Sequence, residues 1–87
     1  MTDLTAKPKL ARLFRMQYEE AQQAYVLLYP EGMVKLNQSA SEILKRCDGE
    51  RDVQAIITDI EQTFNATGLE KDVTGFIDIA IERGWIV

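Results

Sequence analysis

The sequence has 87 residues, 46% hydrophobic and 28% charged, and its net charge is −4. These values are typical of one small soluble globular domain. The chain has no histidine and a single cysteine, Cys47, which excludes a structural zinc site, a histidine-dependent catalytic centre and an internal disulfide. We therefore expect a protein without enzymatic activity, bound metal or cofactor.

Charge is distributed unevenly along the chain. Residues 1–18 carry a net charge of +3, and residues 48–72 carry −5. The acidic second half is poorly suited to a nucleic-acid backbone. No apolar run approaches the length of a membrane span, and residues 1–10 lack an apolar signal core. We therefore expect a cytoplasmic protein that does not bind membranes.

The first part of the sequence predicts a small sheet. Residues 1–7 are polar and are expected to form a flexible segment, followed by one domain over residues 8–87. Alternating or dense apolar residues predict strands at 10–18, 25–29 and 33–36. Their short connections favour an antiparallel meander with the third strand at an edge.

After the third strand, apolar residues recur with the period of a helix. Residues 40–47 place their apolar side chains on one helical face. Asn37 and Ser39 are both candidate N-caps, and Ser39 with Glu42 fits a capping box. Cys47 falls on the apolar face, which predicts a buried thiol rather than a nucleophile.

Two further helices are predicted. The second starts after Asp52 as its N-cap, and the third starts at a capping box of Thr67 and Glu70 and ends before Gly84. The expected apolar face of the second helix is Val53, Ile56, Ile57, Ile60 and Phe64. The expected core stripe of the third helix is Leu69, Val73, Phe76, Ile77, Ala80 and Ile81. Ile79 lies off that stripe, and residues 85–87 are apolar enough to pack back on the domain.

Several segments stand in an order and spacing typical of one known family. They are Pro8-Lys9-Leu10-Ala11-Arg12, Tyr25-Val26-Leu27-Leu28-Tyr29-Pro30-Glu31-Gly32, Leu36-Asn37, Ser39-Ala40, Glu42-Ile43-Leu44, Cys47-Asp48-Gly49, Val53, Ile56-Ile57, Asp72-Val73 and Phe76. Through them, nearly the whole ordered chain resembles the pyrroloquinoline quinone (PQQ) synthesis protein D family (PqqD), whose members are peptide chaperones and RiPP recognition elements. The resemblance agrees with the predicted α+β fold, a three-stranded antiparallel meander followed by three helices, and implies that it is winged-helix-like.

The resemblance also implies a function. Such proteins bind a ribosomally made precursor peptide and present it to a radical-SAM enzyme, which cross-links a glutamate to a tyrosine in the peptide. In that class the peptide lies as an extra strand between the third strand and the last helix. The peptide-binding residues expected here are Met33, Val34, Lys35 and Leu36 on the strand, and Asp72, Phe76, Ile79 and Arg83 on the helix.

Two further expectations concern partners. An exposed edge strand can pair with its own copy, so we expect a weak homodimer when no peptide is present. The alternative function is a winged-helix DNA-binding regulator, with the second helix reading the DNA. The outer face of that helix offers polar and acidic side chains, namely Gln54, Thr58, Asp59, Glu61 and Gln62. Without a cluster of lysine or arginine residues, it is poorly suited to DNA.

Overall fold

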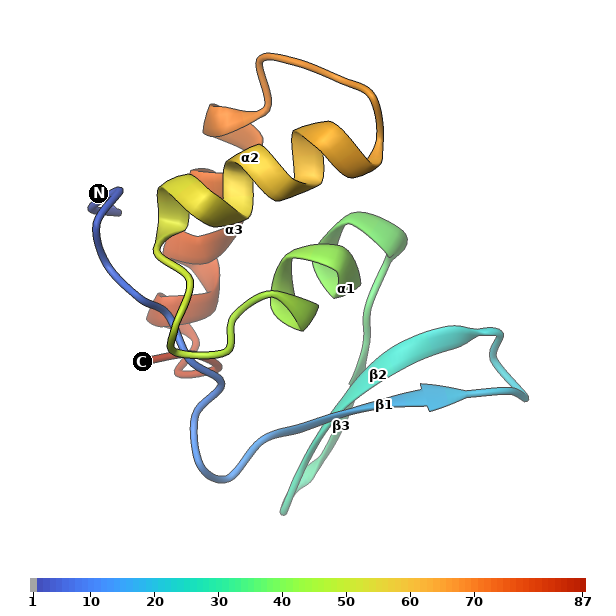
Figure 1. Ribbon diagram of the computed structural model, residues 1–87. Helices are drawn as coiled ribbons and strands as arrows, with labels where there is room; N and C mark the ends of the chain where they lie inside the picture. Colours follow the sequence, from blue (N-terminus) through green and yellow to red (C-terminus); the bar gives the residue numbers. More distant parts are fainter. Residues whose placement is uncertain (1) are drawn as a thin grey trace.

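The computed structural model describes residues 2–87. Three strands are followed by three helices: β1 (Arg15–Glu19), β2 (Ala24–Tyr29), β3 (Gly32–Lys35), α1 (Gln38–Lys45), α2 (Val53–Thr63) and α3 (Glu70–Glu82) (Figure 1). The strands form one antiparallel sheet in the order β1-β2-β3, and the helices lie together on one side of it (Figure 1). The predicted α+β fold is therefore confirmed. Within residues 2–87, no helix combines the length and the apolar character that a membrane span requires.

Only one face of the sheet is covered by the helices. Leu27 on β2 lies opposite Met16 on β1 and Val34 on β3. Leu27 is fully buried, and Met16 and Val34 pack against the same core. Because side chains alternate between the two faces of a strand, Met33 and Lys35 point away from the helices, and both are exposed.

The first strand is shorter than the sequence predicted, because its apolar alternation is divided by a turn. The Phe14 N–H donates to the Ala11 carbonyl over 2.9 Å, which closes this turn. Before the turn, Leu10 pairs through an isolated bridge with Ile86 near the end of the chain. The strand that pairs with β2 therefore begins only at Arg15.

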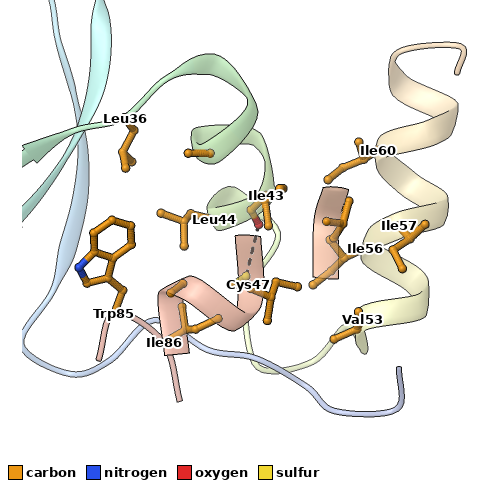
Figure 2. Packing of buried hydrophobic residues seen from close by; sticks show 14 of the residues in the cluster. Leu36, Ile43, Leu44, Cys47, Val53, Ile56, Ile57, Ile60, Trp85 and Ile86 are labelled. Atoms are coloured by element: carbon orange, nitrogen blue, oxygen red, sulfur yellow. Dashed lines mark hydrogen bonds between the residues drawn. The ribbon is translucent and has the colours of Figure 1, made fainter. Parts of the chain in front are cut away.

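The last three residues return to the domain, as predicted, although only Trp85 and Ile86 bury their side chains and Val87 is held by its backbone. α3 ends at Glu82, and Gly84 adopts a φ of 77°, which favours glycine. The Lys9 N–H donates to the Val87 carbonyl over 3.0 Å, and the Val87 N–H donates back over 2.8 Å. Trp85 is almost completely buried in the core (Figure 2).

The core contains most of the residues that the sequence placed there. Figure 2 shows Cys47 among them, with its thiol donating a hydrogen bond to the Ile43 carbonyl. Burial raises the pKa of the Cys47 thiol to about 12, so the thiol is protonated at neutral pH.

Two residues that the sequence placed in the core are instead exposed, Phe64 by 43% and Ile81 by 50%. Phe64 follows the last turn of α2, and α3 buries only a narrow stripe that excludes Ile81.

The capping predictions are partly correct for α1 and correct for α2. The Asn37 side chain accepts the Ala40 N–H over 2.7 Å, which decides between the two candidate caps of α1. The predicted capping box of Ser39 with Glu42 is wrong, because the Glu42 carboxylate binds other side chains. Asp52 caps α2, as predicted, by accepting the Ala55 N–H over 2.8 Å.

The predicted capping box of Thr67 and Glu70 is also wrong. The N-cap residue of α3 is Leu69, whose own side chain makes no capping hydrogen bond. The Leu69 N–H instead donates to the carboxylate of Glu61 over 2.9 Å. A side chain of α2 thus satisfies the backbone where α3 begins.

The N-terminal segment helps to cap α2. The Val53 N–H donates to the Ala6 carbonyl over 2.9 Å, and the Gln54 N–H donates to the Leu4 carbonyl over 3.0 Å. N–H groups at these positions have no partner within a helix. The expected flexibility of residues 1–7 concerns motion and stays a prediction, and Met1 lies outside the described residues.

Arg46 joins the end of α1 to α2. Its guanidinium donates to the Glu42 carboxylate over 2.9 Å, to the Asp59 carboxylate, and to the Thr63 hydroxyl over 3.2 Å. The Arg46 side chain is only 12% exposed, so these bonds are partly shielded from water. The hydrogen bond from Arg46 is the main cause that lowers the pKa of Glu42 and of Asp59.

We predict that Arg46→Ala lowers the free energy of unfolding by about 1–3 kcal/mol at neutral pH, because it removes charge-assisted bonds, leaves Asp59 without its partner and leaves Glu42 with Lys45 alone. Urea denaturation followed by circular dichroism measures the loss. The matched control is Arg51→Ala, since Arg51 makes a longer, exposed pair of 3.6 Å with Asp48. This control should lose much less stability.

The effect of Arg46→Ala should also depend on pH. A carboxyl group whose pKa is lowered on folding stabilises the protein above its unfolded pKa, about 4, and loses this contribution as the pH falls through the folded value. The difference between wild type and Arg46→Ala should therefore shrink below about pH 4. An equal loss in both arginine variants, or a difference that does not change with pH, would contradict this role for Arg46.

Candidate peptide-binding site

The outer edge of β3 carries backbone groups that no other strand of residues 2–87 pairs with, since β3 has only β2 as its neighbour. The Leu36 N–H donates to the Tyr25 carbonyl over 2.9 Å. Hydrogen-bonded positions alternate along an antiparallel pair, so Val34 also directs its backbone to β2. The N–H and C=O groups of Met33 and Lys35 consequently point outward, away from the sheet.

These outward groups form a template for a further strand. Two residues of a strand span about 7 Å, which is the repeat at which an added strand offers its own donors and acceptors. A partner in extended conformation can therefore bond to both Met33 and Lys35. Exposed edges of this kind bind peptides by main-chain hydrogen bonds, and the flanking side chains select the sequence.

The four predicted strand residues do not lie in equivalent positions. Met33, which is 49% exposed, and Lys35 lie on the outer face of the sheet. Val34 is half-buried and packs toward the helices. Leu36 follows the last residue of β3 and is only 4% exposed. Its side chain is part of the core and offers little surface to a ligand.

The four predicted helix residues lie along one side of α3, with Arg83 at the C-cap just after its last residue. Asp72, Phe76, Ile79 and Arg83 are spaced by three or four residues, which places them in one row on a helix. Ile79 is 47% exposed, Asp72 and Arg83 are exposed, and Phe76 is half-buried. The row thus offers an apolar centre with an acidic and a basic end.

Trp85 packs against this row. Its ring centroid lies 6.3 Å from that of Phe76, and the Arg83 guanidinium lies 5.6 Å from the Trp85 ring. Figure 2 shows the Trp85 ring pointing toward Leu36. From the sequence, Trp85 is expected only to pack back on the domain, and its contact with the α3 row is not predicted. The available signal was its place directly after the glycine that ends α3, within reach of the last turn of that helix.

Two hollows lie next to the predicted site residues. The larger, about 470 Å³, lies between α1, α2 and α3, and Asp72 forms part of its lining. The smaller, about 320 Å³, lies between the sheet and α1 and includes Leu36. Neither hollow is predictable from the sequence, since each is formed by segments that meet only in the folded chain.

Comparison with known proteins identifies the family. Residues 24–86 match the family Coenzyme PQQ synthesis protein D (PqqD). A PqqA binding protein of Azotobacter vinelandii is 50% identical over 86 residues, which cover 98% of this chain and 94% of that protein. A PqqA binding protein of Methylococcus capsulatus is 47% identical over 78 residues, covering 90% and 84%.

A solved structure extends the similarity to three dimensions. It is the solution NMR structure of the PqqD truncation of Methylobacterium extorquens PqqCD, described as a functional and stand-alone RiPP recognition element. That structure is 26% identical in sequence, has a TM-score of 0.84, and matches over 100% of this chain and 95% of its own. On the family match and these relatives, this chain belongs to the PqqD family.

Proposed function

We propose that this protein binds the precursor peptide PqqA during PQQ synthesis and presents it to the radical-SAM enzyme that cross-links it. Its membership of the PqqD family and its relatives named PqqA binding protein support this function. The family is non-catalytic, so the protein contributes recognition and no chemistry. Two observations support the proposal: β3 has an unpaired outer edge, and α3 carries a row of exposed residues.

In the proposed complex, the peptide adds to β3 as a fourth strand. The outward N–H and C=O groups of Met33 and Lys35 bind its main chain, while alternate peptide side chains face α3. Phe76 and Ile79 form an apolar wall for those side chains. Burial of this wall supplies affinity that the main-chain bonds alone do not supply.

The ends of the α3 row add selectivity through charge. Asp72 and Arg83 are eleven residues apart in the sequence, about 16 Å along a helix axis. An extended peptide spans this distance in about five residues. A basic residue facing Asp72 and an acidic residue facing Arg83, at about that spacing, therefore fix the direction and register of the bound peptide.

Two proline variants test the strand pairing. Lys35→Pro deletes an outward N–H, so we predict about tenfold weaker binding of synthetic PqqA with little change in Tm. Val34→Pro deletes an N–H directed at β2 and should mainly lower the Tm. Lys35→Ala keeps the N–H and should bind almost like the wild type. Calorimetric titration measures the affinities, and thermal melts followed by circular dichroism measure the stabilities.

A variant on α3 tests the other wall. Ile79→Ser should weaken PqqA binding without unfolding the protein, because Ile79 is about half exposed. Phe76→Ala is a less clean test, since that ring also packs against Trp85. If folded Lys35→Pro and Ile79→Ser both bind PqqA with wild-type affinity, the peptide lies elsewhere and the proposed binding mode is wrong.

The free edge also supports the proposal that the protein forms a weak homodimer without peptide, by pairing β3 with β3 of a second copy. Light scattering over a wide concentration range should show a rise in mass that added PqqA reverses. A strict monomer at millimolar concentration would contradict this self-association.

We further propose that the protein acts in the cytoplasm, where its one thiol stays reduced.

A further inference from the structure

The larger hollow has the construction of a pocket for an apolar side chain. Its volume is about 470 Å³. The buried side chains of Ile43, Ile60 and Val73 contribute an apolar lining, and Phe64 and Leu69 belong to the same lining. Three helices thus border an open space that is large enough for a large aliphatic or aromatic group.

Phe64 is the unusual member of this lining. It follows the last turn of α2, and its N–H still bonds to the Ile60 carbonyl over 3.0 Å. Its side chain is nevertheless 43% exposed. An aromatic ring left in water beside an apolar hollow gains stability when a partner covers it.

The hollow continues the proposed peptide site. Asp72 is both a lining residue of the hollow and the first member of the exposed row on α3. On the opposite side, Gln38 and Ser39 line the hollow from the first turn of α1. They follow Lys35 by three and four residues, so a peptide that pairs with β3 and runs on past Lys35 reaches this opening.

Charge at the opening favours a ligand in which a basic residue lies next to the apolar side chain. Glu42 and Asp72 both line the hollow. The Glu42 carboxylate is already paired with Lys45 over 3.3 Å and with Arg46 over 2.9 Å. Asp72, by contrast, makes no ion pair or side-chain hydrogen bond with any residue of the described chain, which leaves its carboxylate available to a lysine or arginine of a ligand.

We propose that the hollow between α1, α2 and α3 is a second recognition site for the precursor peptide, which seats one large apolar side chain next to a basic residue that pairs with Asp72. The apolar residue belongs to the peptide segment that flanks the strand paired with β3. This inference rests on the proposed function, because it requires the peptide to lie on β3.

The test blocks the opening of the hollow and leaves its buried lining residues Ile43, Ile60 and Val73 unchanged. Ser39 is exposed in the first turn of α1, and Ser39→Trp places an indole across the opening. We expect PqqA to bind this variant about tenfold or more weakly. The matched control is Thr58→Trp on the exposed face of α2, outside the lining of the hollow, which should bind like the wild type. Circular dichroism checks that both variants are folded.

Peptide variants then identify the occupant. Each large apolar residue of PqqA is replaced by alanine in turn. One replacement should weaken binding to the wild type and have no further effect in Ser39→Trp, since that variant has already lost the contact. In the wild-type complex, the methyl groups of Ile43 and Ile60 should show intermolecular NOEs to the same peptide residue.

The outcomes separate this inference from the proposed function. If Ser39→Trp binds with wild-type affinity and the methyl groups show no intermolecular NOEs, while Lys35→Pro binds weakly, the second site is wrong and the β3 site stands. If none of these variants changes the affinity, both are wrong. NOEs to a second copy of the protein, in place of the peptide, would also overturn the second site.

Discussion

The burial of Trp85 ties the end of α3 to the segment that precedes β1. The Trp85 N–H donates to the Ala80 carbonyl, and its own carbonyl accepts the Ala11 N–H, each over 2.8 Å. These bonds fix the residue between the end of α3 and the segment that precedes β1. Its ring then lies beside Phe76 and points toward Leu36. In the proposed complex, Trp85 therefore supports the α3 wall near the end of β3.

The same arrangement explains why an edge strand remains open. The helices cover one face of the sheet, and the chain passes from β3 directly into α1, so no element of residues 2–87 returns to pair with β3. Open edges favour aggregation, and proteins usually limit them by keeping the strand short and placing a lysine on it. β3 has four residues and includes Lys35. It is therefore long enough for a few main-chain bonds and too short to pair strongly by itself.

Periodicity predicted most of the fold, and it failed where contacts distant in sequence decide the structure. The order of the six elements and the exposure of Ile79 follow from spacing alone. The capping box assigned to Glu42 was wrong because Arg46 binds that carboxylate. The predicted start of the first strand was wrong because Leu10 pairs with Ile86 near the end of the chain.

For the candidate site, the row on α3 could be drawn from a helical wheel. The hollow and the bridging role of Trp85 could not, because they depend on which helices meet.

Amide hydrogen exchange of β3, followed by NMR with and without PqqA, tests the central claim most directly. In the free protein, the Val34 amide should be protected by its bond to β2, whereas the Met33 and Lys35 amides should exchange quickly. Saturating PqqA should slow exchange at Met33 and Lys35. If both amides continue to exchange quickly while the peptide is bound and protects other parts of the chain, the peptide does not extend the sheet at β3.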